Sequence, residues 1–264
     1  MRRVVAQLMH SLAAAVGSKV GKEAEELCAS GQCAAAMVAL KLAVYCGHVS
    51  SRALMANMMM DGREGVAKDH CGAVALLKEG QRLGCHHCQG LLAWGCTLAP
   101  STVQWGNDTR SLQWARESST KGSRYGQYML GQYYEGRCDY AQAVALYRLA
   151  AAQTLDKAQL RLGHMHFNGF GVAQDFTEAL RLYQLAAAQG EPQALYDVAA
   201  CHDEGKGVRQ NRAEAILWYR RAQAAGHGKN CFDGDVERAL YRAAQLLPRK
   251  STGGKAPRTQ TARE

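Results

Sequence analysis

A repeat of 36 residues limits the folds that this chain can adopt. Residues 158–193 align without a gap with residues 194–229. The glycines and the valine of one short loop return at this spacing, as Gly169, Gly171 and Val172 followed by Gly205, Gly207 and Val208. A fixed period of about 20–50 residues is typical of a solenoid, in which each unit buries its apolar face against the next. The repeat therefore predicts a stack of similar units rather than one closed core.

Weaker copies extend the repeat toward the amino terminus. The clearest units span residues 53–85, 126–157, 158–193 and 194–229, and the loop of the second is shortened by about four residues. A more divergent unit carries an insert at 96–108, and residues 23–48 resemble a partial first unit. These matches predict a repeat region over residues 23–247.

Each unit has the pattern of two helices joined by a tight turn. Ala158 and Leu162 are four residues apart, so they share one helical face. The loop that follows places Gly169 and Gly171 where the chain must turn, and glycine adopts positive φ there without a Cβ clash. The sequence therefore predicts an all-α protein, an α-solenoid of stacked helix-turn-helix repeats.

Polar residues mark the start of the second helix in each unit. Asp175 and Asn211 occupy the position where an N-cap is needed. Glu178 and Glu214 follow three residues later, which is the spacing of a capping box. We therefore expect both helices to begin at these caps and each glutamate to bond back to its cap.

The repeated residues resemble the Sel-one-like repeat (SLR), a relative of the tetratricopeptide repeats. The match follows the pattern A-x-x-x-L-G-x-x-Y-x-x-G-x-G-V-x-x-D-x-x-x-A-x-x-W-Y-x-x-A-x-x-x-G and covers roughly residues 23–228. Its structural positions include Gly169, Gly171, Asp175, Gly205, Gly207, Asn211 and Trp218. The resemblance implies an adaptor or scaffold whose concave face binds protein partners, with no chemistry of its own. The tryptophans Trp94, Trp105, Trp114 and Trp218 are candidate anchors for a partner, although Trp218 fills a core position of the repeat and is expected to pack there.

The positive charge is concentrated at the two ends of the chain. The chain has 32 Lys and Arg against 23 Asp and Glu, a net charge of +9. Residues 1–22 contain four bases and no acid, residues 248–264 contain five bases and one acid, and the rest is left with a net +1. A nucleic-acid-binding domain usually has its positive charge on the folded body, so no direct nucleic-acid binding is expected. Residues 1–22 form either a first helix or a targeting segment, and no apolar run is long enough to span a membrane.

The carboxy-terminal segment 248–264 differs from the repeats in composition. It contains no large apolar residue, so we expect a disordered basic tail. Arg249-Lys250-Ser251-Thr252-Gly253-Gly254-Lys255-Ala256-Pro257-Arg258 resembles ten consecutive residues of the amino-terminal tail of histone H-three. The resemblance implies that Lys250 is a methylation or acetylation candidate, Arg258 a methylation candidate, Ser251 a phosphorylation candidate and Lys255 an acetylation candidate. Pro248 departs from the histone, which has alanine there, and removes a backbone donor that chromodomain readers use.

The ten cysteines do not recur at the repeat period, which disfavours a disulfide framework. One compact cluster, Cys85-His86-His87-Cys88, is a weak metal candidate because no second pair of ligands follows at standard spacing. His166 and His202 are 36 residues apart and are expected to pack in the core rather than to bind a ligand. No signature of a nucleophile elbow, a zinc protease or a kinase is present, so neither an enzyme nor a cofactor is expected.

The sequence favours a protein-interaction scaffold whose tail mimics a histone tail and binds histone-modifying or histone-reading proteins. The alternative is a cysteine-rich assembly factor in the mitochondrion or outside the cell. The cytoplasm or nucleus is favoured over the mitochondrion.

Overall fold

The computed structural model describes residues 2–30, 32–62, 65–95, 109–225 and 240–241. These residues contain twelve α-helices and no β-strand, so the predicted all-α solenoid is confirmed. The insert 96–108, the tail 248–264 and the modification candidates Lys250, Ser251, Lys255 and Arg258 lie outside the described residues. No helix in the described part is long and apolar enough to cross a bilayer.

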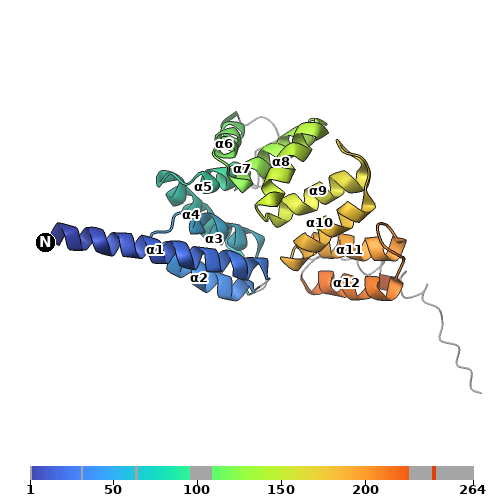
Figure 1. The fold of residues 1–264 in the computed structure, drawn as a ribbon, viewed down its shortest axis with the longest axis horizontal. Coiled ribbons are helices and arrows are strands. Elements are labelled where there is room, and N and C mark those ends of the chain that lie inside the picture. The colour runs from blue at the N-terminus through green and yellow to red at the C-terminus, as the bar shows by residue number, and fades with distance from the viewer. Residues whose placement is uncertain (1, 31, 63–64, 96–108, 226–239, 242–264) are drawn as a thin grey trace, which may run out of the picture.

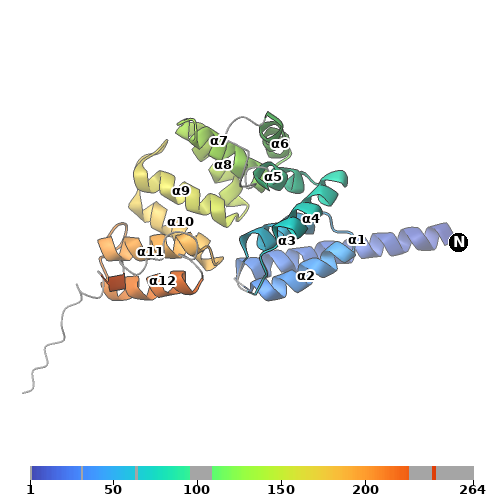
Figure 2. The ribbon, with the colours of Figure 1, turned by 180° about the vertical axis from the view of Figure 1, so that it is seen from behind.

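The helices form six successive antiparallel pairs. They are α1 (Arg2–Ala29) with α2 (Cys33–Tyr45), α3 (Ser51–Asp61) with α4 (His70–Arg82), α5 (His86–Gly95) with α6 (Thr109–Thr120), α7 (Arg124–Glu135) with α8 (Tyr140–Ala152), α9 (Asp156–Asn168) with α10 (Phe176–Ala188), and α11 (Pro192–Glu204) with α12 (Arg212–Ala224). The row of pairs bends, so that α1–α4 and α9–α12 form two arms joined through α5–α8 (Figure 1). The view from behind shows the same arrangement (Figure 2). Helix α1 continues without a break across residue 22, where the sequence analysis placed the boundary between the amino-terminal segment 1–22 and the repeat region 23–247.

Glycines at the turns let each unit contact the one before it. Gly169 and Gly171 have φ of 73° and 69°, in the left-handed region. A Cβ on Gly171 would lie 2.6 Å from the carbonyl carbon of Tyr140, the first residue of α8. One repeat later, a Cβ on Gly207 would overlap the backbone of Phe176 at the start of α10. Each turn therefore rests on the second helix of the preceding unit, where only glycine fits.

The loop between α7 and α8 is shorter than the equivalent loop of the next unit. Helix α7 ends at Glu135 and α8 begins at Tyr140, whereas seven residues separate α9 from α10. The short connection makes Cys138 adopt a φ of 61°, which is uncommon for a residue with a Cβ.

The second helices begin at side-chain caps. The Asp175 carboxylate accepts hydrogen bonds from the backbone N–H groups of Thr177 and Glu178 at 2.9 and 3.0 Å. Asn211 accepts from the N–H of Glu214 at 3.2 Å. The prediction that each glutamate accepts a hydrogen bond from the backbone N–H of its cap residue is wrong at both sites. The N–H of each cap donates instead to a first-helix carbonyl, of His166 and of His202 respectively.

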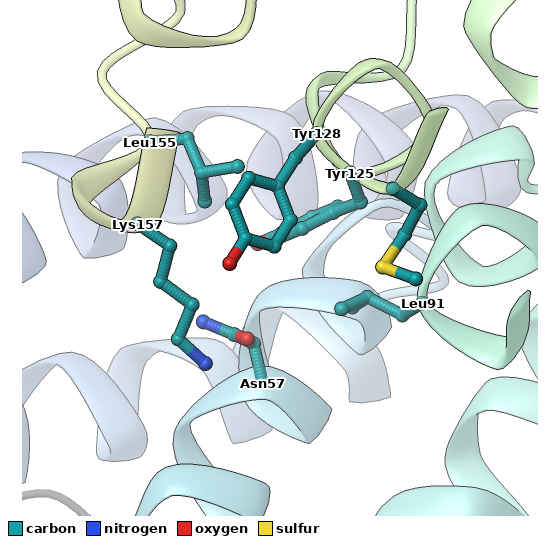
Figure 3. Close-up of a pocket in the computed structure, with 7 residues that line it drawn as sticks. Asn57, Leu91, Tyr125, Tyr128, Leu155 and Lys157 are labelled. Carbon is teal, nitrogen blue, oxygen red and sulfur yellow. The ribbon is translucent and has the colours of Figure 1, made fainter. Parts of the chain in front are cut away.

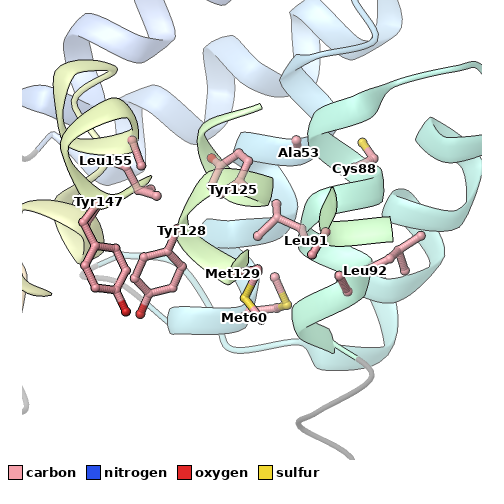
Figure 4. Packing of buried hydrophobic residues seen from close by; sticks show 14 of the residues in the cluster. Ala53, Met60, Cys88, Leu91, Leu92, Tyr125, Tyr128, Met129, Tyr147 and Leu155 are labelled. Atoms are coloured by element: carbon pink, nitrogen blue, oxygen red, sulfur yellow. The ribbon is translucent and has the colours of Figure 1, made fainter. Parts of the chain in front are cut away.

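Close contact between a small residue and a tyrosine joins the two helices of a unit. A Cβ on Gly131 would lie 2.6 Å from the Tyr147 ring, and one on Gly163 would lie 2.5 Å from the Tyr183 ring. Both rings are buried. The largest apolar cluster runs from α3 to α10, and Figure 4 shows Tyr147 in it beside Tyr128. The absence of a side chain on the glycine is what lets the ring lie against the helix backbone.

Candidate functional site: the inner face of the solenoid

The first helices of several units approach one another across the inside of the bend. Lys157 of α9 forms an ion pair with Asp61 of α3, with 2.5 Å between Nζ and Oδ1. Arg124 of α7 pairs with Glu25 of α1 at 3.3 Å. These residues are separated by 96 and 99 positions in the sequence. The first pair therefore connects the two arms of the solenoid, and the second connects α1 to the segment between the arms.

The space at this crossing is almost filled. A cavity lined by Asn57, Leu91, Tyr125, Tyr128, Met129, Leu155 and Lys157 has a volume of only about 10 Å³. Figure 3 shows the Lys157 side chain extending toward Asn57 beneath the Tyr128 ring. That volume holds about one water molecule. A partner segment cannot pass through the inner face at this level.

The charge of Lys157 is maintained by its neighbours. Burial acts to lower the pKa of this ammonium, but the carboxylates of Asp61 and Asp156 outweigh it and raise the pKa. Burial also raises the pKa of the Tyr128 hydroxyl, which stays neutral. The crossing is therefore a charged pair enclosed by aromatic and apolar side chains.

An open groove lies beside this crossing, at the loop edge of the inner face. Its volume is about 370 Å³, and we call it the α7–α9 groove. It is lined by Gln132, Glu135, Gly136, Tyr140, Arg161 and Phe170. Arg161 occupies the position in α9 that Met129 occupies in α7, and Met129 lines the small cavity. The groove is therefore a continuation of the inner face.

A pair of stacked aromatic rings forms one wall of the α7–α9 groove. The rings of Tyr140 and Phe170 are 4.8 Å apart with an interplanar angle of 16°. Phe170 lies between the two turn glycines, and the close approach of Gly171 to Tyr140 brings the two rings together. Phe170 remains 43% exposed, so its ring offers an apolar surface to a partner.

Polar groups form the opposite wall. Arg161 pairs with Glu135 at 3.7 Å, and Glu135 accepts a hydrogen bond from the buried Tyr147 hydroxyl. Gln132 donates from Nε2 to the Tyr128 hydroxyl at 2.9 Å. Its other amide atom, Oε1, is buried and has no hydrogen-bond partner among the described residues. The groove thus offers a guanidinium and an aromatic surface, with a buried amide oxygen behind them.

The groups around Arg161 keep its guanidinium positively charged. Burial acts to lower the pKa of the guanidinium, whereas Tyr128 and Glu135 raise it, and the net shift is upward. Burial and the Glu135 carboxylate raise the pKa of Tyr147. At neutral pH the wall carries a charged guanidinium and a neutral phenol, which suits hydrogen bonding to a peptide rather than proton transfer.

A second hollow lies between the second helices α8 and α10, with α9 below them. Its volume is about 590 Å³ and its charged groups include Glu178 and Arg181. Arg181 binds Glu178 through two hydrogen bonds of 2.6 and 2.8 Å. None of the residues that line this hollow is Phe, Tyr or Trp. Because it lacks an exposed aromatic wall, we regard the α7–α9 groove as the better candidate.

The residues singled out from the sequence lie mainly outside both walls of the groove. Gly169, Gly171, Gly205 and Gly207 lie in turns, and Asp175 and Asn211 cap helices. Trp218 is half-buried and donates from Nε1 to Glu214 at 3.0 Å. The structure brings none of these side chains together in one site.

The two repeat-spaced histidines and the tryptophans predicted as anchors lie in different environments. Nδ1 of His166 and of His202 is buried without a hydrogen-bond partner in the described part of the chain. Trp114 packs against the largest apolar cluster. Trp105 lies outside the described residues, and so does the Trp94 side chain.

Eight cysteines lie in the described part of the chain, and none of them forms a disulfide there. They are Cys28, Cys33, Cys46, Cys71, Cys85, Cys88, Cys138 and Cys201. Within the same residues no three His, Cys, Asp or Glu side chains gather as a metal site. The Cys85–Cys88 cluster therefore lacks a third described ligand.

Several residues of the groove were not predicted from the sequence. Phe170 carried one usable signal, since a large apolar residue stands between two turn glycines where the next unit has Lys206. Gln132 and Arg161 carried no such signal, because their importance depends on which helix surface faces the inside of the bend.

Comparison with protein families identifies three consecutive Sel1 repeats in this chain. The matches cover residues 124–155, 156–191 and 192–227, each beginning two residues before the corresponding unit predicted from the sequence. They include α7 to α12, and so both helices that form the polar wall of the α7–α9 groove. The search of curated proteins found no match.

Solved structures with the same fold include two bacterial proteins. One is the Sel1 repeat protein from Oxalobacter formigenes, with 19% identity, a TM-score of 0.51, and coverage of 85% of this chain and 99% of that one. The other is a protective antigen of uropathogenic Escherichia coli displaying an SLR fold, with 23% identity, a TM-score of 0.50 and coverage of 79% of this chain. This chain spans about half (48%) of the length of the E. coli protein. At these identities the similarity shows the fold alone.

Proposed function

We propose that this chain, which carries three Sel1 repeats, is a non-enzymatic scaffold that binds an extended segment of a partner protein in the α7–α9 groove. Sel1 repeat proteins generally act as protein-interaction scaffolds. The observation that carries the proposal is the exposed ring of Phe170, which is stacked on Tyr140 in a groove also lined by Arg161. An apolar side chain of a partner that covers this ring removes apolar surface from water, which stabilises the complex.

The remaining groove residues suit the same ligand. A backbone carbonyl of the partner segment would accept a hydrogen bond from the Arg161 guanidinium, which is 41% exposed. An apolar side chain of the partner would pack on the exposed ring of Phe170, which the stacked Tyr140 holds in place. Aromatic and arginine side chains are the most frequent energetic centres of protein interfaces.

The test uses peptides selected from a random library on the full-length protein. We expect Phe170→Ala to weaken binding of the selected peptides at least about tenfold, which corresponds to about 1.4 kcal/mol. Leu217→Ala is the matched control, because Leu217 is a similarly exposed apolar residue on α12, away from the groove. Binding is measured by fluorescence anisotropy. Equal affinity of the selected peptides for both variants and the wild type would contradict the proposal.

The proposal extends to the tail as a mimic of a histone tail. Ten consecutive matching residues at 249–258 support it, since basic composition alone does not produce such a run. Lys250, Ser251, Lys255 and Arg258 would be the modified residues. Acetylation of Lys255 would remove one positive charge, and phosphorylation of Ser251 would add about −1.5 to −2.

This second part is tested by incubating the full-length protein with histone acetyltransferases and mitotic kinases. Mass spectrometry is expected to find acetyl-Lys255 and phospho-Ser251, and to lose each signal in Lys255→Arg and Ser251→Ala. Pro248→Ala restores the histone alanine, so it is expected to improve chromodomain binding to methylated Lys250. A tail that stays unmodified beside a histone that is modified in the same reaction would rule out mimicry.

A further inference from the structure

Two cysteines flank the first turn of helix α5. Cys85 immediately precedes the helix, and its sulfur accepts a hydrogen bond from the backbone N–H of Cys88 at 3.4 Å. The Cys85 thiol is therefore the N-cap of α5, as the Ser123 hydroxyl is for α7. Cys85 is 6% exposed and Cys88 is fully buried. The C-x-x-C spacing thus brings two buried sulfurs together, and only that of Cys85, at the start of the helix, belongs to a residue with any exposed area.

A buried cation lies beside this pair. Arg52 of α3 is only 8% exposed, and its stem and the Cys88 sulfur both lie against Gly80 of α4. Its Nη2 contacts the mostly exposed carboxylate of Glu79 at 3.4 Å. Its Nε and Nη1 are buried and have no hydrogen-bond partner in the described residues. A buried guanidinium with unsatisfied donors favours a neighbouring anion.

The other groups around the pair also favour a thiolate at Cys85. The pKa of Cys85 is held well below its usual range by hydrogen bonding from the Cys88 thiol and from the backbone N–H groups of Cys88 and His87, against the opposing effect of burial. The positive charge of Arg52 acts in the same direction. Burial lowers the pKa of His87 to about 4, so this ring is neutral at pH 7 and bonds Ser123 at 3.1 Å.

Core packing alone does not account for two sulfurs at these positions. The equivalent residues of α7 are Ser123 and Gly126, and the residues equivalent to Cys88 in α9 and α11 are Ala158 and Ala194. In the neighbouring units a serine hydroxyl is enough to cap the helix, and glycine or alanine is enough to fill the buried position. The sulfur pair adds a chemical capability that the fold does not require.

We propose that Cys85 and Cys88 form a reversible dithiol–disulfide couple that is oxidised by hydroperoxides. This proposal is independent of the α7–α9 groove. The Cys85 thiolate attacks a peroxide oxygen, forming an S–O bond and breaking the O–O bond, and the released alkoxide or hydroxide takes up a proton. The Cys88 sulfur then attacks the Cys85 sulfur, forming the S–S bond. The S–O bond breaks, and the hydroxide leaves as water with the Cys88 proton.

The two electrons that reduce the peroxide come from the two thiols. A small thiol such as glutathione reverses the reaction by two exchange steps, in which two thiols become one disulfide and the protein dithiol is restored. In the oxidised form the negative charge beside Arg52 is lost. Oxidation of the couple would therefore change the charge at the place where α3, α4 and α5 meet.

The test measures the pairing of Cys85 and Cys88 in the full-length protein. The protein is treated with hydrogen peroxide or with mixtures of reduced and oxidised glutathione, alkylated with N-ethylmaleimide and digested with trypsin. The tryptic peptide 83–110 also contains Cys96, so Cys96→Ser serves as the background. We expect this peptide to lose two hydrogens and to take up no alkylating agent. Exposed Cys71 and Cys138 should instead gain glutathione or remain alkylated.

Two variants identify the role of each sulfur. In Cys88→Ala, Cys85 should accumulate as a sulfenic acid that reacts with dimedone, or as a glutathione adduct. In Cys85→Ser, which keeps a capping oxygen as in α7, Cys88 should stay reduced. Circular dichroism confirms that both variants fold. Alkylation of both cysteines under all oxidising conditions, or disulfides that join either one indiscriminately to other cysteines, would overturn the proposal.

Discussion

The contact between Gly163 and Tyr183 shows how one missing side chain fixes the spacing of two helices. The Tyr183 ring is buried against the α9 backbone at the place where a Cβ would stand. Gly131 and Tyr147 repeat the arrangement in the preceding unit. The residue types within one hairpin are enough to set this contact, because both partners belong to the same unit.

Gly163→Ala tests this contact. The added methyl group must displace a buried ring, and overpacking outweighs the better helix propensity of alanine. We expect a net loss of about 1–2 kcal/mol in the free energy of unfolding. Urea unfolding followed by circular dichroism measures it.

Gly136→Ala is the control. This residue has an ordinary φ of −63°, and a Cβ there would meet only atoms 3.5 Å or more away. It should be neutral or stabilising by about 0.4–1 kcal/mol. Equal effects of the two substitutions would show that the Tyr183 contact does not set the helix spacing.

At the scale of the helix, the caps were predicted only in part. Asp175 and Asn211 begin α10 and α12 as the spacing indicated, because an N-cap depends on residues two or three positions away. The glutamates at the third position behave differently. Glu178 binds Arg181, and the N–H of Asp175 donates to His166 of the preceding helix. That bond between two helices could not be foreseen from the local pattern.

Asp175→Ala removes acceptors from two backbone N–H groups at the start of α10. We expect a loss of about 1 kcal/mol in the free energy of unfolding. Asp175→Asn should retain most of the stability, since Asn211 performs the same task one repeat later. Thermal unfolding of the three proteins provides the comparison. A loss in Asp175→Asn as large as in Asp175→Ala would show that the charge, rather than the cap, is what matters.

At the scale of the whole molecule, the ion pair between Lys157 and Asp61 connects the two arms of the solenoid. Neither residue is prominent in the repeat pattern, and 96 positions separate them. Whether they meet depends on the rotation between neighbouring units, which accumulates over the array. The pair closes the inner face near α3 and leaves the α7–α9 groove as the open part.

Lys157→Met leaves the partly buried Asp61 without this cation. We expect a loss of about 2–3 kcal/mol in the free energy of unfolding, because removing one partner of a buried pair is strongly unfavourable. Small-angle X-ray scattering should show a larger radius of gyration as the arms separate.

The double variant Asp61→Lys with Lys157→Asp restores an ion pair with the charges exchanged. It should therefore recover part of the lost free energy of unfolding and part of the smaller radius of gyration. Arg181→Met breaks an exposed pair and should change stability by less than about 1 kcal/mol. An unchanged radius of gyration in Lys157→Met would mean that the Lys157–Asp61 pair is not needed to hold the arms together.

The sequence alone determined the units of this protein: paired helices, glycine turns and capped second helices, repeated along the chain. These features follow from steric and hydrogen-bonding requirements within one hairpin, so a 36-residue period is enough to identify them. The tertiary structure alone decided which helix surfaces face one another. It placed Lys157 against Asp61, enclosed Arg52 beside Cys85 and left Gln132 unsatisfied in the α7–α9 groove. These contacts depend on small rotations summed over successive units and on side chains that differ between repeats, neither of which a repeat pattern records.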